Sequence, residues 1–206
     1  MHVHTCYSSD SSITLEQLVF YGKRQGLDGV AVTDHDTLEG AFKIASTSDF
    51  LIIPGIEVHS SEGHVVGLNV KETVPSKLSP SETVDRIHRV GGIAVACHPV
   101  GLFKGGLGKR TSRDFDAVEV INSSAIPFNY SVRQNMKIAS NLGKPKVAGT
   151  DAHYAAEIGC AYTVINSQKN VEDIIRAVKK GSCQPFGRAI PLSLRVERMF
   201  ERKRRV

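Results

Sequence analysis

The sequence of 206 residues lacks long apolar runs, and its N-terminus shows no charged segment followed by an apolar one. Because no stretch reaches ~18 apolar residues, we expect neither a membrane span nor a secretory signal. These absences predict a cytoplasmic protein. Low-complexity linkers and internal repeats are also missing, and the length suffices for one buried core, which favours a single domain.

Cysteine is scarce as well. The four cysteines, Cys6, Cys97, Cys160 and Cys183, show no CxxC spacing and are too sparse for a disulfide scaffold. We expect them to be reduced interior thiols. Cys97 adjoins a histidine with possible metal chemistry, but packing is its expected role.

Positive charge is unevenly distributed, although the formal net charge is only +5. One cluster comprises Lys104, Lys109, Arg110 and Arg113. A second crowds the end of the chain, at Arg195, Arg198, Arg202, Lys203, Arg204 and Arg205. Either cluster could contact the phosphates of a nucleic acid or of a small anionic substrate, and a terminal charge run can equally be a solvated segment.

Short apolar runs alternate with amphipathic ones along the whole chain, which predicts strands alternating with helices. Strands are expected at 29–33, 50–53, 56–60, 64–70, 93–96, 117–121, 146–149 and 161–165. Helices are expected at 14–26, 38–45, 81–90, 130–142, 171–180 and 192–204. This alternation predicts a parallel α/β sheet, either open or closed into a barrel.

Histidine clusters in short polar signatures at the ends of the predicted strands. Six of the eight histidines lie in the signatures HVH, TDHDT, GHVVG, ACHP and GTDAH. Together with nearby carboxylates they make nine candidate metal ligands: His2, His4, Asp10, His35, Glu57, His64, His98, Asp151 and His153. Because a barrel brings all its strand ends to one face, this pattern favours a barrel with a multinuclear metal site.

The spacing of these residues suits metal binding. Strand alternation points His2 and His4 to the same side, so one ion could be held by both imidazoles. Asp151 and His153 repeat that geometry with mixed ligands. Glu57 could bridge two ions, because a carboxylate has two oxygens. The residues Asp34 and Asp36 flank His35 and could orient it as outer partners of the metal site.

These motifs resemble those of the PHP (polymerase and histidinol phosphatase) superfamily, and they run from His2 to about residue 190. The resemblance rests on HVHT with Ser8 and Asp10, VTDHDT at 32–37, PGIE at 54–57, HVVGL at 64–68, ACHP at 96–99 and GTDAH at 149–153. It implies a distorted (β/α)7 TIM-like barrel over 1–190 followed by a basic, helical tail over 191–206. It also implies a trinuclear centre of zinc, manganese or iron in which the nine residues fill all nine ligand places.

Within that superfamily the chain is most similar to stand-alone metal-dependent phosphoesterases of nucleotides or oligonucleotides. The implied chemistry is hydrolysis by water whose pKa the ions lower. Candidate phosphate contacts are Lys104, Lys109, Arg110 and Arg188, each of which could equally be plain surface charge. Only Met1 precedes the HxH motif, so the first strand is short as given. A glycine- and lysine-rich stretch after Pro99 is a candidate substrate loop.

Two other classes of function remain open at this point. An amidohydrolase-like enzyme would also use an HxH motif and would cleave C–N bonds, but no position suits its carboxylated lysine. A non-catalytic, nucleic-acid-associated subunit would not require an open multinuclear site. His59 and His88 are expected to be structural or surface residues, although His59 could reach the outer shell of the site. Asn122 could contact substrate or form a turn.

Overall fold

The computed structural model describes residues 1–102 and 105–203, with side chains in the last helix described up to Glu201. Its strands are β1 (Gly29–His35), β2 (Leu51–Ser60), β3 (Gly63–Leu68), β4 (Ile93–Ala96), β5 (Ala117–Asn122), β6 (Lys146–Gly149), β7 (Ala161–Ile165) and β8 (Cys183–Gly187). Its α-helices are α1 (Leu15–Arg24), α2 (Glu39–Thr47), α3 (Pro80–Arg89), α4 (Phe128–Leu142), α5 (Val171–Lys179) and α6 (Leu192–Lys203). Short 3-10 helices occupy Gly108–Arg110 and Ala155–Glu157.

Local sequence signals explain where several helices begin and end. Thr14 caps α1 and Gln17 bonds back to it, which forms a capping box. Ser79 and Glu82 form a second capping box at α3. Gly143 ends α4 in the left-handed conformation, with φ of 65°. Among the described helices, none is long and apolar enough to cross a bilayer.

The main sheet contains six strands in the order β1 to β6. β1 pairs with β2 in parallel, and β4, β5 and β6 are also parallel neighbours. β3 runs antiparallel to both β2 and β4. The expectation of a parallel sheet is therefore wrong at β3. The reason is that β2 and β3 are joined by only Ser61 and Glu62, and a two-residue connection can join only antiparallel strands.

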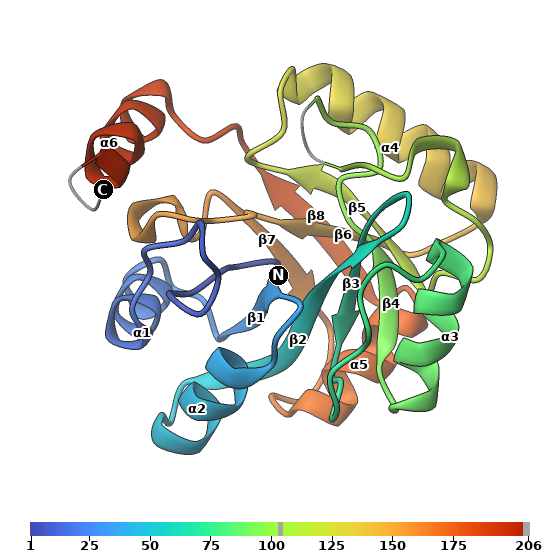
Figure 1. Ribbon diagram of the computed structural model, residues 1–206, viewed down its shortest axis with the longest axis horizontal. Coiled ribbons are helices and arrows are strands. Elements are labelled where there is room, and N and C mark those ends of the chain that lie inside the picture. The colour runs from blue at the N-terminus through green and yellow to red at the C-terminus, as the bar shows by residue number, and fades with distance from the viewer. Residues whose placement is uncertain (103–104, 204–206) are drawn as a thin grey trace.

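The N-terminal segment closes the curled sheet. Val3 bridges in parallel to Val32 of β1 and to Ala152, which follows β6. The Val3 carbonyl accepts from Thr33 N at 2.9 Å, and His4 N donates to the Ala152 carbonyl at 3.0 Å. The first residues therefore take the place of a seventh strand, and the distorted α/β barrel is confirmed (Figure 1).

The last two strands lie outside the main sheet. β7 pairs with β8 in an antiparallel ladder, with Ile165 opposite Cys183. The strand at 161–165 was expected as part of the main sheet, and β8 was not expected. Its sequence contains Pro185 and has no clear apolar alternation, so its strand structure depends on pairing with β7.

Helices cover the outside of the barrel. The side chains in its interior change from apolar to polar along the barrel. In Figure 1, α3 and α4 flank the sheet opposite α1 and α2. One apolar cluster joins inward residues of the strands to α5, among them Ala31, Ile53, Val95, Val147 and Ile174. Alternation places His35 on the same face as Ala31, and Glu57 on the same face as Ile53. The interior is therefore apolar toward one end and polar toward the other.

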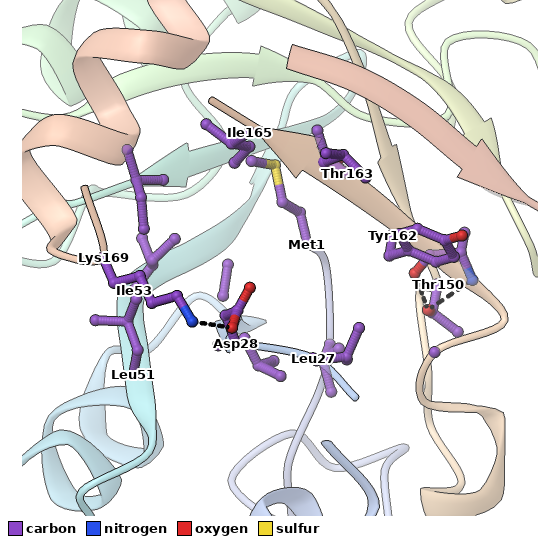
Figure 2. A pocket seen from close by; sticks show the side chains of 18 of the residues that line it. Met1, Leu27, Asp28, Leu51, Ile53, Thr150, Tyr162, Thr163, Ile165 and Lys169 are labelled. Atoms are coloured by element: carbon purple, nitrogen blue, oxygen red, sulfur yellow. Dashed lines mark hydrogen bonds and ion pairs between the residues drawn. The ribbon is translucent and has the colours of Figure 1, made fainter. Parts of the chain in front are cut away.

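A cavity of about 290 Å³ opens at the apolar end. It is lined by the first residues of β1, by the start of β2, and by β7. Figure 2 shows Met1, Leu51, Ile53 and Ile165 around it, with the Lys169–Asp28 ion pair at its edge. The Lys169 and Asp28 atoms are 2.6 Å apart.

Candidate metal centre

The Glu57 carboxylate, which is 1% exposed, lies at the centre of a group of imidazoles at the ligand-bearing end of the barrel. Its Oε2 lies 3.1 Å from Nε2 of His2, 3.1 Å from Nε2 of His4 and 3.4 Å from Nδ1 of His35. Its Oε1 lies 2.9 Å from Nδ1 of His64 and 3.0 Å from Nε2 of His98. One carboxylate therefore contacts five imidazole rings that come from four different segments of the chain.

Two further carboxylates extend the cluster. Asp151 Oδ1 lies 3.3 Å from His4 Nε2 and 3.6 Å from both His2 Nε2 and His153 Nδ1. Asp10 Oδ2 lies 3.0 Å from His153 Nε2 and 3.6 Å from His35 Nε2. The fold thus brings together all nine residues singled out as candidate ligands.

The backbone is strained at three of these residues. His2, His98 and Asp151 have φ angles of 65°, 31° and 54°, in the left-handed region that side chains other than glycine seldom adopt. Such conformations cost on the order of 1–3 kcal/mol each and gather at functional sites. Among the described residues, three of the six non-glycine residues with positive φ are therefore candidate ligands.

Charge coupling inside the cluster is strong. Burial on its own lowers the pKa of His4, but the nearby carboxylates of Asp151 and Glu57 outweigh it and raise the pKa to about 9. The pKa of His2 is likewise raised, because Glu119, Glu57 and Asp151 overcome its burial. Burial opposes the charged form of Glu57, yet the surrounding imidazoles hold its pKa well below the ordinary value. In the metal-free chain, the His2 and His4 imidazoles therefore favour the protonated form, and metal cations could take the place of these protons.

Several buried imidazole nitrogens of the cluster lack a hydrogen bond, which indicates whether cations would fit between them. His2 Nε2, His4 Nε2, His35 Nδ1 and His98 Nδ1 are buried without a hydrogen-bond partner. Buried polar atoms are normally satisfied, so a group of orphaned ring nitrogens beside carboxylates points to a missing cation. Ligand atoms within 4.8 Å of one another form four groups: His2, His4, Glu57 and Asp151; Glu57, Cys97 and His98; His4, His35 and His153; and His35, His59 and His64. Divalent metal ions fit this donor set.

Comparison with known proteins agrees with this geometry. The family described as PHP domain matches residues 1–104, and one described as PHP-associated matches residues 130–183. The chain belongs to the PHP family. The expected family assignment is therefore confirmed.

Individual proteins resemble the chain over different lengths. An uncharacterised protein of Methanocaldococcus jannaschii is 34% identical over 137 residues, covering 60% of this chain and 80% of its own. A phosphoribosyl 1,2-cyclic phosphate 1,2-diphosphodiesterase of Eggerthella lenta is 31% identical over 98 residues, covering 43% of this chain but only 37% of its own. A two-domain protein of Bacteroides vulgatus, described as containing a predicted PHP-like metal-dependent phosphoesterase, has a TM-score of 0.73 at 14% identity. That alignment covers 97% of this chain and 68% of the other.

Glu119 is a functional residue that the sequence analysis missed. It is 2% exposed, its Oε1 lies 3.0 Å from His2 Nδ1, and its Oε2 accepts from His98 N at 2.8 Å. Asn122 donates to Glu119 at 2.9 Å and to Asp151 at 3.3 Å. A Cβ on Gly149 would collide with this carboxylate. The signal in the sequence was a lone glutamate inside the otherwise apolar strand 117–121.

The carboxylates that flank His35 in sequence reach other partners. Asp34 accepts from Thr5 N at 2.5 Å, from Thr5 Oγ1 at 2.7 Å and from Ser8 Oγ at 3.0 Å. Ser8 Oγ also lies 3.3 Å from His4 Nδ1. Asp34 therefore holds the loop that orients His4. Asp36 bonds His59, with its Oδ2 2.8 Å from Nδ1.

Cys97 lies directly beside the centre. Its Sγ is 3.6 Å from Glu57 Oε1, and it is fully buried. Burial first, and then the nearby charge of Glu57, raises the pKa of the thiol well above its ordinary value. The neutral thiol donates to Glu57, which is compatible with the packing role expected for it.

The candidate phosphate contacts lie on different segments of the chain. Lys104 is outside the described residues. Lys109 and Arg110 are exposed on the loop that follows Gly105, whose carbonyl accepts from His64 N at 2.8 Å, and Arg110 pairs with Glu62 at 2.7 Å. Arg188 is exposed beyond β8, where its N–H donates to the Cys160 carbonyl. The loop after Gly105 therefore adjoins the centre.

Two arginines of the basic tail face inward. Arg195 donates to the carbonyls of Ser123 and Ser124 at 3.1–3.3 Å. Arg198 lies 3.2 Å from Glu157, a fully buried carboxylate that also accepts from His153 N at 3.0 Å. The helix α6 is therefore attached to the segment that carries His153.

Proposed function

We propose that this PHP protein is a metal-dependent phosphoesterase that hydrolyses phosphate esters of nucleotides or short oligonucleotides at a centre of three divalent ions. Zinc, manganese and iron suit its mixture of imidazole and carboxylate ligands. The observation that carries the proposal is a set of three buried imidazole nitrogens, on His2, His4 and His35, which lie 3.1–3.4 Å from Glu57 Oε2 without forming a hydrogen bond.

Three groups of side chains would hold the ions. These are His2, His4, Glu57 and Asp151; His64, His98 and Glu57; and Asp10, His35 and His153. Bound divalent ions would supply Lewis-acid charge for phosphate oxygens and lower the pKa of a water molecule toward neutrality.

The protein's own residues would orient and isolate this chemistry. Glu119 sets the ring of His2, and Ser8 with Asp34 sets the ring of His4. The inner ligands are almost completely buried, which keeps bulk water from competing for them. Since each imidazole would serve as a ligand, we assign no separate general acid.

The choice of substrate class rests on the charge at the mouth. Lys109 and Arg110 lie on the loop that adjoins His64, where arginine could bind a phosphate through two parallel hydrogen bonds. The relative from Eggerthella lenta is named for hydrolysis of a sugar phosphodiester, which supports the same class of bond. We propose Arg188 as a further contact, and the basic tail as a weak nucleic-acid contact. Arg195 and Arg198 are already engaged within the fold.

The test is phosphate release by protein that has been stripped of metal and then reloaded with manganese or zinc. The substrates are p-nitrophenyl phosphate, a nucleoside bisphosphate, and short single-stranded DNA and RNA. We expect metal-dependent release that is lost in Asp151→Ala and kept in Lys169→Ala, a variant at the other end of the barrel. Absence of turnover on every substrate, with ions bound, would refute the phosphoesterase and leave a binding role.

A further inference from the structure

The histidine His59 stands outside the nine candidate ligands, yet it faces the same centre. We propose that His59 is a further metal ligand and that an ion at an outer position would be held by His35, His59 and His64, so that His35 and His64 would serve either this ion or the inner ions assigned to them above. The inference extends the metal centre of the proposed function and rests on it.

Strand register places these three histidines together. His35 of β1 lies opposite Glu57 of β2, and alternation puts Glu57 and His59 on the same face of β2. His59 lies directly opposite His64 of β3 in the antiparallel ladder. Three adjacent strands therefore each present one imidazole to the interior of the barrel.

The rings are close enough to share an ion. The ring centroid of His59 is 4.6 Å from that of His35 and 4.4 Å from that of His64. One nitrogen from each ring lies within 4.8 Å of the others. The side chains are 19%, 45% and 21% exposed for His35, His59 and His64, whereas His4 is fully buried. This position is therefore the outermost of the centre.

Asp36 contacts His59 in the same way that a carboxylate outside the ligand shell contacts a metal-binding histidine. Its Oδ2 lies 2.8 Å from His59 Nδ1, and its Oδ1 accepts from His59 N at 2.9 Å. Asp36 itself has a φ of 54°, and its N–H donates to the Glu57 carbonyl at 3.0 Å. A carboxylate on one ring nitrogen leaves the other, Nε2, for an ion and increases its basicity.

Three imidazoles favour particular metals. Nitrogen ligands suit zinc, cobalt, nickel and copper, while magnesium and calcium prefer oxygen ligands. An ion held there would place positive charge at the entrance to the centre, where an anionic phosphate ester would arrive.

The chain offers a matched control. His88 Nε2 lies 2.7 Å from Asp116 Oδ2, so this pair has the same chemistry as His59 and Asp36. His88 lies on α3, on the outside of the barrel, and its side chain is 37% exposed against 45% for His59. If His59→Ala loses metal and His88→Ala does not, the loss is therefore not a general effect of removing an exposed histidine.

The experiment is a cobalt titration of the metal-stripped full chain. Visible absorption and bound metal are followed for the wild type, His59→Ala, His59→Gln, Asp36→Asn and His88→Ala. We expect both His59 variants to weaken one binding step by more than ~10-fold, and Asp36→Asn to weaken it by ~10- to 100-fold, as loss of an outer partner does. His88→Ala should titrate as the wild type does, and His59→Cys, which keeps a ligating atom, should retain the step.

The inference would be overturned if both His59→Ala and His59→Gln gave the same cobalt titration and the same spectrum as the wild type. Thermal melts check that each variant is folded. Because binding is measured without turnover, the two hypotheses fail separately. If no phosphate ester is hydrolysed but His59→Ala still loses the step, only the proposed function fails. If the wild type hydrolyses esters and His59→Ala binds cobalt unchanged, only this inference fails.

Discussion

The two ends of the barrel interior are built from the same strands, but they differ in how far their polar atoms are hydrogen-bonded. At the end where β1 finishes, ring nitrogens of His2, His4, His35 and His98 are buried without a hydrogen bond, although the Glu57 carboxylate lies close to three of them. At the end where β1 starts, the cavity is lined mainly by apolar residues, and several of its polar groups are paired. There Thr163 Oγ1 bonds both the N–H and the carbonyl of Ala148, and Lys169 bonds Asp28.

This difference shows which hollow is built for a ligand. A cavity whose polar groups are already satisfied offers no directed bond to a polar substrate. Buried nitrogens that lack partners are costly unless something binds them, because each has lost its hydrogen bond to water. Four such nitrogens gather among the candidate ligands. Variants at each end can test this contrast.

The largest effect is expected from Glu57→Gln, which removes the charge shared by five imidazoles. Loss of an outer partner alone costs ~10- to 100-fold in affinity or activity, so loss of this central ligand should cost more than ~100-fold in both. Bound metal and phosphate release are the measurements. Glu62→Gln, on the exposed turn of the same hairpin, should behave as the wild type does. Full metal content in Glu57→Gln would contradict the site.

The stability of the metal-free protein should depend on pH at the ligand end. His4, with its pKa raised from 6.5 to about 9, contributes stability that is complete below pH 6.5 and is lost as pH rises toward 9. Glu57 and Glu119, with pKa values lowered from 4.5, contribute stability that is present above pH 4.5 and is lost as pH falls. We therefore expect maximum stability between these two limits.

Thermal melts of chelator-treated protein across that range check the expectation. Metal should reverse the alkaline loss, since ions bind neutral imidazole and compete with protons. A metal-free melting temperature that is as high at pH 9 as at pH 5.5 would contradict the coupling.

A smaller effect is expected from Glu119→Gln, which keeps the size of the side chain but removes the charge beside His2 Nδ1. We expect metal affinity to fall by ~10- to 100-fold with the fold intact. Metal titration and a thermal melt together separate these two properties. Unchanged affinity would show that Glu119 only packs.

At the apolar end, Thr163→Val removes a hydroxyl without changing the shape of the side chain. The N–H and carbonyl of Ala148 would lose their bonds to this hydroxyl, so the free energy of unfolding should fall by about 1–2 kcal/mol. Metal affinity should stay unchanged. Denaturant unfolding with a parallel metal titration measures both, and loss of metal here would show that the two ends are coupled.

The smallest effect is expected from Lys169→Ala. The pair with Asp28 is 2.6 Å long, but the side chains are 75% and 69% exposed. Exposed pairs contribute little, so stability should change by less than ~0.5 kcal/mol and metal binding should not change. A larger loss in denaturant unfolding would mean that this pair supports the edge of the cavity.

Local patterns in the sequence predicted those parts of the site that depend on residues close together along the chain. Strand alternation places His2 beside His4, and the ends of apolar runs locate His35 and Glu57. Each of these features depends on contacts within a few residues, which the order of the side chains specifies.

Tertiary structure alone decided the remainder. The roles of Glu119 and His59 depend on register between strands, since their partners are 117 residues away at His2 and 23 away at Asp36. Closure by Val3, and the ladder of β7 with β8, depend on pairing between distant segments. The sequence by itself determined which donors the chain carries and that they end strands. Only the fold decided which nitrogens and oxygens meet, because backbone pairing sets those distances across the barrel.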